Sequence, residues 1–142
     1  MNILVINGPN LNLLGRREPE IYGRGSYEDL CAFLQDYAKE RHCGLEILQT
    51  NHEGTIIDWL QDRSESVDAF ILNPGAFTHY SYAIRDAIKA VPRPVVEVHL
   101  SDLSQREPFR RVSVLKDVCA HQIMGKGFQS YSEAIDWLMK GQ

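Results

Sequence analysis

Glu97 and His99 stand in the apolar run EVHLS, separated by one residue. Alternate side chains of a β-strand point to the same side, so the Glu97 carboxylate could orient the His99 imidazole and raise its basicity. Such a pair is suited to general acid or base chemistry. A glutamate in an apolar strand is costly unless it is paired, so a purely structural ion pair would also explain the pattern.

A second candidate is the long segment NGPNLNLLGRREPEIYG, residues 7 to 23. It carries the amides of Asn10 and Asn12 and places Arg17 five residues before Tyr22. Loops of this length are usually functional, and this one could bring Arg17 and Tyr22 over a substrate as a lid. A solvated surface loop with a packed tyrosine is the alternative.

A third candidate is NPGAFTH, residues 73 to 79, which follows another apolar run. Gly75 permits a tight turn, and Asn73 and His79 supply polar contacts. Asp86 follows seven residues after His79, about two helical turns along on much the same face. In the alternative interpretation, Asn73 only caps a strand and His79 only caps a helix.

The elements that must position these residues alternate along the chain. Short apolar runs at 3–6, 45–48, 69–72, 95–98 and, more weakly, 118–124 are typical of strands buried on both faces. Helical patterns lie at 26–41, from about 55, at 81–90 and from about 130, with Ser26 and Ser130 as expected N-caps. Gly44 is expected to end the first helix.

This alternation predicts an α/β fold with helices on both faces of a parallel sheet. Five strands in a chain of this length favour a flavodoxin-like three-layer sandwich with strand order 2-1-3-4-5. Ligands of such sheets bind beyond the carboxyl ends of the strands, where all three candidate segments lie.

Composition narrows the function classes. The 142 residues suit a single domain, 1–142, and 44% hydrophobic with 24% charged residues is typical of a globular protein. The net charge of −4 argues against a nucleic-acid partner. No apolar stretch approaches a membrane span, and the N-terminus does not resemble a secretory signal. Three widely spaced cysteines favour reduced thiols and a cytoplasmic protein.

Motifs for other chemistries are missing. The chain has no phosphate-binding glycine loop, no nucleophile elbow and no histidine or cysteine spacing typical of zinc, so neither a cofactor nor a metal is expected. The residues by themselves leave three classes open: an enzyme that uses these groups for acid or base chemistry, a flavin- or nucleotide-binding module and an inactive scaffold.

Four segments together resemble the type II 3-dehydroquinate dehydratases. They are NGPNLNLLGRREPEIYG, QTNHEGTIIDWL (residues 49–60), ILNPGAFTHYSYAIRDAI (residues 71–88) and EVHLSDLSQREPFRR (residues 97–111). The resemblance is collinear and covers nearly the whole chain. It implies a lyase that converts 3-dehydroquinate to 3-dehydroshikimate through an enolate, in the shikimate pathway or in quinate breakdown. The implied assembly is a dodecamer, a tetramer of trimers.

The resemblance also implies a role for each matching residue. Tyr22 would be the base and Arg17 its activator, Asn10 would help hold a water at the enolate oxygen, and His99, oriented by Glu97, would be the general acid. The residues that would bind substrate hydroxyls and carboxylate, or touch the lid side of the site, are Asn73, His79, Asp86, Leu100, Ser101, Arg106 and Arg110.

These residue types fit the reaction. An unperturbed tyrosine has a pKa of about 10, and a neighbouring guanidinium favours the phenolate that a base requires. A carboxylate-held imidazole can protonate the leaving hydroxyl, and no step calls for a metal, a nucleotide or a Schiff-base lysine. The chain departs from the family pattern at Val112, where histidine is common, and over residues 105–108, which include Arg106.

Overall fold

The computed structural model describes residues 1–16, 18–22 and 25–141, and the side chain of Tyr22 lies outside the described part. Five parallel strands form one sheet in the order β2-β1-β3-β4-β5, which confirms the predicted α/β class and strand order. The strands are β1 (Asn2–Asn7), β2 (Gly44–Gln49), β3 (Ala69–Asn73), β4 (Val95–His99) and β5 (His121–Met124).

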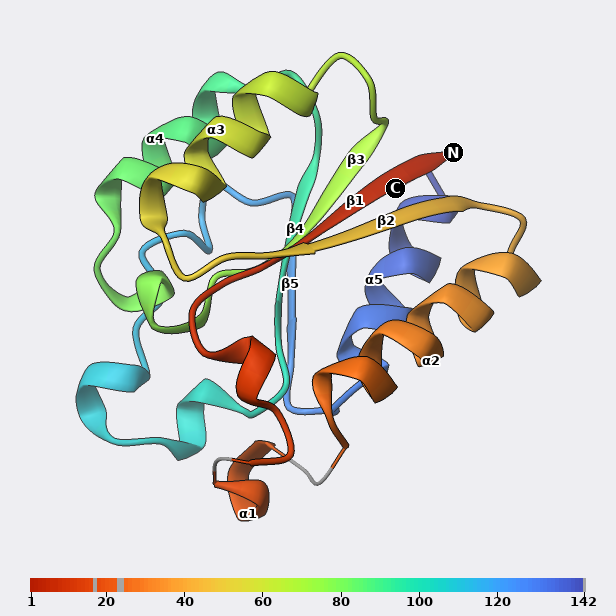
Figure 1. Cartoon of the computed structure of the whole chain (residues 1–142). Helices are drawn as coiled ribbons and strands as arrows, with labels where there is room; N and C mark the ends of the chain where they lie inside the picture. The colour runs from red at the N-terminus through yellow and green to blue at the C-terminus, as the bar shows by residue number, and fades with distance from the viewer. Residues whose placement is uncertain (17, 23–24, 142) are drawn as a thin grey trace.

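Helices cover both faces of this sheet (Figure 1). Helices α2 and α5 pack on one face and α3 and α4 on the other, while α1 lies at the carboxyl end of the sheet. The helices are α1 (Pro19–Tyr22), α2 (Tyr27–Glu40), α3 (Glu53–Arg63), α4 (Tyr82–Ala90) and α5 (Gln129–Met139).

Alternation along each strand divides the core into two layers. In β1, Ile3 and Val5 pack towards α2 and α5, whereas Leu4 and Ile6 pack towards α3 and α4. The same alternation continues in β3 and β4, and the inner strands are buried on both sides. Continuous apolar runs are the expected sequence pattern for strands in this position.

The helix starts agree with the sequence at two places and differ at two. Ser26 and Asp29 form a complete capping box at α2, and Ser81 caps α4. Helix α3 begins two residues before the expected Thr55. Helix α5 begins at Gln129, beside the expected Ser130, but the expected capping box was wrong. Its N-cap is Phe128, the Ser130 hydroxyl accepts from the Lys126 backbone N–H, and Glu133 pairs with the Lys126 ammonium.

The expected helix stop at Gly44 is also corrected. The left-handed conformation after α2 is taken by His42, with φ of 56°, and Gly44 instead begins β2. An added Cβ at Gly44 would meet Asn2 Oδ1, the end of an exposed side chain, which would have to move.

The connections at the carboxyl end of the sheet fold into short 3-10 turns rather than open loops. They are η1 (Leu11–Leu13), η2 (Gly75–His79), η3 (Leu103–Gln105) and η4 (Pro108–Arg110). Together with α1 they lie at one end of the molecule (Figure 1). Among the described residues, no helix has the length and apolar character needed to span a membrane.

Candidate active site

A pocket opens where β1, β3 and β4 end, the edge at which the sequence predicts ligand binding. Its walls come from the turns after these three strands and from the segment that carries η3 and η4. Eight of the sequence-predicted site residues line it: Asn10, Asn73, His79, His99, Leu100, Ser101, Arg106 and Arg110.

Glu97 and His99 form the predicted pair. The imidazole Nε2 of His99 lies 2.6 Å from the Glu97 carboxylate, and both side chains are buried. Because His99 also lines the pocket, the pair is more than an ion pair closed off inside the core. The carboxylate accepts from Nε2–H, so Nδ1 is the ring nitrogen left for other partners.

Three further side chains donate to the Glu97 carboxylate. The Thr78 hydroxyl donates to one oxygen, the Ser113 hydroxyl is 2.9 Å from both oxygens, and the Gln122 amide donates at 3.0 Å. These residues come from η2, from the segment after η4 and from β5, where Gln122 is the register partner of Glu97. Sequence reasoning missed all three, because their polar groups converge only in the tertiary structure.

The donors determine the ionisation of Glu97. Burial would raise the pKa of its carboxyl group, but hydrogen bonds from His99, Thr78 and Ser113, with the charge on His99, outweigh burial and hold the pKa below its usual value. Glu97 is therefore an anion in a buried site, and it can stabilise a positive charge on His99.

His79 presents a defined tautomer to the pocket. Its Nδ1 lies 2.7 Å from the backbone carbonyl of Val112, so Nδ1–H donates and Nε2 carries the lone pair. Burial lowers the pKa of His79, the hydrogen bond to Val112 opposes that, and the charges on His99, Arg110 and Arg106 lower it further. The neutral ring can thus accept a hydrogen bond from a hydroxyl group.

This contact also explains why Val112 is tolerated. Val112 is 54% exposed, and the atom that contacts His79 is its backbone carbonyl oxygen. Any residue at position 112 could supply that carbonyl, so the departure from the family pattern leaves the His79 tautomer intact.

Asn10 occupies a strained backbone position. Its φ is 69°, in the left-handed region that non-glycine residues rarely adopt. Its backbone N–H donates to Asn51 Oδ1 at 3.1 Å, and the Gln49 amide donates to both Asn51 Oδ1 and the Gly8 carbonyl at 3.1 Å. The end of β2 thereby holds the turn that carries Asn10, a support that sequence reasoning did not identify.

Two arginines give the pocket a cationic wall. The Arg106 Nη1 donates to the Ser101 hydroxyl at 3.2 Å, and its side chain is only 10% exposed. The Arg110 guanidinium contacts Glu107 at 3.1 Å and lies over the Phe109 ring at 4.7 Å from its centre. Guanidinium groups beside neutral donors are a suitable arrangement for a small carboxylate.

The remaining predicted residues are placed differently. Asp86 is exposed on α4 and does not belong to the described lining of the pocket. His79 lies in η2 rather than on α4, so the two residues do not share a helix face. Arg17 and the side chain of Tyr22 lie outside the described residues.

Comparison with known proteins identifies the class to which this site belongs. A family model described as dehydroquinase class II matches residues 1–139, and the chain belongs to this family. It is 53% identical to a 3-dehydroquinate dehydratase of Clostridium acetobutylicum over 92% of this chain and 91% of the relative. It is 49% identical to the 3-dehydroquinate dehydratase of Thermotoga maritima, over 99% of this chain and 96% of the relative.

Comparison with solved structures leads to the same family. A type II dehydroquinase from Butyrivibrio crossotus superimposes with a TM-score of 0.95 at 50% identity, covering 97% of each chain. A 3-dehydroquinate dehydratase-like protein from Bifidobacterium longum is more distant, with a TM-score of 0.69 at 28% identity over 96% of this chain and 93% of that chain. Family membership favours the lyase hypothesis over a flavin- or nucleotide-binding module.

The ionised state of Glu97 predicts a pH dependence of stability. Because its pKa is lower in the folded than in the unfolded protein, the unfolded state binds the proton more readily. Glu97 therefore stabilises the fold above the ordinary glutamate pKa of about 4.3, and this contribution is lost as pH falls through the folded-state pKa. We expect Glu97→Gln to flatten the dependence of the unfolding free energy on pH below 5, measured by urea denaturation.

A matched control is Glu133→Gln, which removes a surface carboxylate paired with Lys126. It should leave the acid limb of the stability profile close to that of the wild type. An acid limb that is equally steep in Glu97→Gln would contradict the ionised buried carboxylate.

Proposed function

We propose that the chain is a 3-dehydroquinate dehydratase, a lyase that converts 3-dehydroquinate to 3-dehydroshikimate through an enolate. The observation that carries the proposal is an imidazole, His99, held by a buried carboxylate at the wall of a pocket that also presents Arg106 and Arg110. Relatives that bear this enzyme's name align along almost the whole chain.

In the proposed reaction a base first removes the carbon-bound proton next to the ketone. We assign the base to Tyr22, with Arg17 favouring its phenolate. Both residues belong to the segment from residue 15 to residue 22, whose helix α1 lies at the same end of the sheet as η1 and η3 (Figure 1). Closure of this segment over the substrate would exclude water and complete the site.

The enolate that forms needs donors at its oxygen. Asn10 is the proposed residue here, acting with an ordered water. Its turn is held by Asn51 and Gln49 before substrate arrives, so the donor does not have to reorganise during the reaction. The left-handed backbone at Asn10 is consistent with a functional position in which strain is maintained by the surroundings.

Departure of the hydroxyl group requires a proton. His99 is the proposed general acid, and the anionic Glu97 stabilises the imidazolium from which that proton comes. Since Thr78, Ser113 and Gln122 hold the carboxylate, the imidazole keeps one orientation throughout the cycle.

Binding of the substrate is assigned to the remaining pocket residues. The carboxylate would contact Arg110 and the backbone of Leu100 and Ser101, with Arg106 anchored on the Ser101 hydroxyl. The ring hydroxyls would contact Asn73 and the Nε2 lone pair of His79.

We further propose that the reaction uses neither a metal nor a Schiff base. The described lining of the pocket offers imidazole, guanidinium, hydroxyl and amide groups, and it includes no lysine. Within the described residues, no group of three histidine, cysteine or acidic side chains is arranged to hold a metal ion. The steps assigned above are proton transfers that these side chains can perform.

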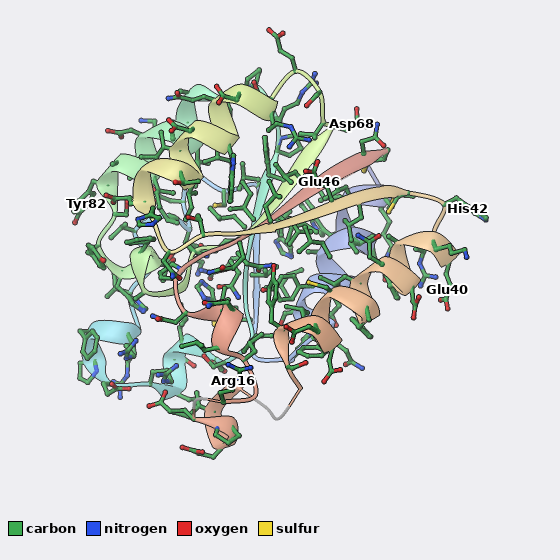
Figure 2. All side chains as sticks on the ribbon, viewed as in Figure 1. Arg16, Glu40, His42, Glu46, Asp68 and Tyr82 are labelled. Atoms are coloured by element: carbon green, nitrogen blue, oxygen red, sulfur yellow. The ribbon has the colours of Figure 1, made fainter. Side chains whose placement is uncertain are left out.

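Assembly into a dodecamer, a tetramer of trimers, is part of the proposal. Four apolar or aromatic side chains are exposed beside the pocket end of α4 and η4: Tyr80, Tyr82, Phe109 and Val112. Tyr82 projects from the outer side of α4 (Figure 2). Such a patch suits a protein interface. Asp86 lies on the same helix, so a substrate contact from Asp86 would have to come from a second copy of the chain.

We also propose that residues 1–142 form a single catalytic domain, because one sheet with both faces covered carries all the described residues that line the pocket. A cytoplasmic location stays a prediction, and the three unpaired cysteines are compatible with it.

The first test of function is turnover of 3-dehydroquinate, followed through the ultraviolet absorbance of the conjugated enone acid. We expect full activity after dialysis against a chelator, and full activity after treatment with borohydride in the presence of substrate and desalting. No absorbance rise from folded protein would refute the dehydratase. Loss with chelator or with borohydride would refute the metal-free or the imine-free mechanism, respectively.

Two substitutions test the acid and the base. His99→Gln and Tyr22→Phe should each lower kcat by about 10²- to 10⁴-fold, the usual contribution of a positioned acid or base. The matched control is His121→Gln, because His121 is exposed and stacks on Trp137 at the far edge of the sheet. Near-normal kcat in a folded His99→Gln or Tyr22→Phe protein would remove that residue from its role.

Light scattering tests the assembly. Twelve chains of 16.2 kDa predict a particle of about 194 kDa. Tyr82→Glu should reduce the measured mass and raise KM, since it places a charge in the proposed interface next to Asp86. Met139→Glu changes another exposed apolar residue, on α5, and should leave both unchanged. A wild-type monomer with full activity would contradict an interface that contributes to the site.

A further inference from the structure

Three buried polar side chains lie beneath the pocket. Only one of them, Asn73, has been given a role above, as a proposed substrate contact. They are Asn7, Asn73 and Tyr131, with exposed fractions of 0%, 3% and 0%. Buried polar groups are costly unless they are paired, so their mutual arrangement calls for an explanation.

The fold brings the three together through strand register. Asn7 and Asn73 are the last residues of β1 and β3, and they are register partners. Ile3 and Val5 in β1, and Ile71 in β3, lie an even number of positions before these asparagines and therefore on the same face of the sheet. Because the three apolar residues face the α2 and α5 layer, both amides point to that layer. Tyr131, in the first turn of α5, is part of the same layer.

The hydrogen bonds form a chain with one direction. The Asn73 Nδ2 donates to the Tyr131 hydroxyl at 2.9 Å, and that hydroxyl donates to Asn7 Oδ1 at 2.7 Å. A phenol has one proton, so donation to Asn7 leaves its oxygen as an acceptor for Asn73. Neighbouring bonds in such a chain strengthen one another in a low-dielectric interior.

This chain determines which way the Asn73 carboxamide is turned. With Nδ2 directed at Tyr131, Oδ1 accepts from the Gly75 backbone N–H at 3.1 Å and closes the turn at the end of β3. Gly75 has φ of 59° and lies against Pro9, so the same turn shapes two walls of the pocket. A flipped amide would put two donors, Nδ2–H and the Gly75 N–H, against each other.

We propose that Tyr131 is a positioning residue for substrate binding: its hydroxyl holds the Asn73 carboxamide in the orientation that the substrate requires. The inference rests on the proposed function and adds a residue to it. Tyr131 is not one of the described residues that line the pocket, and it acts through Asn73, which is. Burial raises the pKa of the Tyr131 phenol above its usual value, so the hydroxyl keeps its proton at neutral pH.

The test is Tyr131→Phe, which keeps the ring and removes only the hydroxyl. Asn73 contacts the substrate in the ground state and the transition state alike, and loss of such uniform binding raises KM without lowering kcat. We expect KM for 3-dehydroquinate to rise about 10-fold, as for one misdirected hydrogen bond, with kcat within about twofold of the wild type. A role in stability alone would lower the melting temperature and the active fraction, and KM would not change.

A double-mutant cycle shows whether Tyr131 acts through Asn73. In an Asn73→Ala background, Tyr131→Phe should change KM by less than about twofold, because the amide it positions is gone. The matched control is Tyr37→Phe, which removes another phenol hydroxyl between α2 and α5, bonded to Asp136 at 2.6 Å. It should leave KM unchanged.

Unchanged KM in folded Tyr131→Phe, or an effect that is fully additive with Asn73→Ala, overturns the inference. If Tyr131→Phe does not fold, Asn7→Ala replaces it. The Tyr131 hydroxyl then loses its acceptor, and it can donate to Asn73 only if that carboxamide flips and gives up its bond to the Gly75 N–H, so KM should again rise. An unchanged KM in Asn7→Ala would also overturn the inference. Absence of turnover in the wild type would overturn the proposed function first, which separates the two failures.

Discussion

The burial of one carboxylate constrains much of this structure. Glu97 has no solvent exposure, and an unpaired charge in that position would cost several kcal/mol. Four donors offset the cost, and they come from four different parts of the chain: β4 itself, η2, the segment after η4, and β5. Each of these parts must therefore reach the same point, and the turns around the pocket are positioned by that requirement.

The donors also explain why β5 is part of the sheet despite its weak sequence pattern. Only four residues pair with β4, and one of them, Gln122, is in register with Glu97 and donates to it. A shift of one residue would turn Gln122 to the other face. The hydrogen bond from Gln122 to Glu97 thus helps to fix the register of β5 against β4, although β5 has few apolar side chains.

A second polar network lies on the opposite face of the sheet. Asn7, Asn73 and Tyr131 occupy the α2 and α5 side, whereas Glu97 and its donors occupy the α3 and α4 side. Both networks lie at the carboxyl ends of the strands, where the apolar core gives way to the pocket. Their bonds orient His99 and Asn73 from beneath, so the groups that face a ligand are held by the interior rather than by solvent.

Local chemistry was sufficient to predict the strands, the parallel order and most helices, because burial on both faces and helical periodicity leave clear patterns in the sequence. The sequence also predicted the contact between Glu97 and His99, because alternation along a single strand is enough to place the two side chains on the same face. The capping box expected at the start of α5 was wrong because Ser130 and Glu133 are both bonded to Lys126, a contact that a local capping rule does not consider. Only the tertiary structure decided that Thr78, Ser113 and Gln122 converge on Glu97, that Tyr131 joins Asn7 to Asn73, and that Asp86 lies apart from the pocket of its own chain. These contacts join residues from 16 to 124 positions apart, and their geometry depends on how the layers pack.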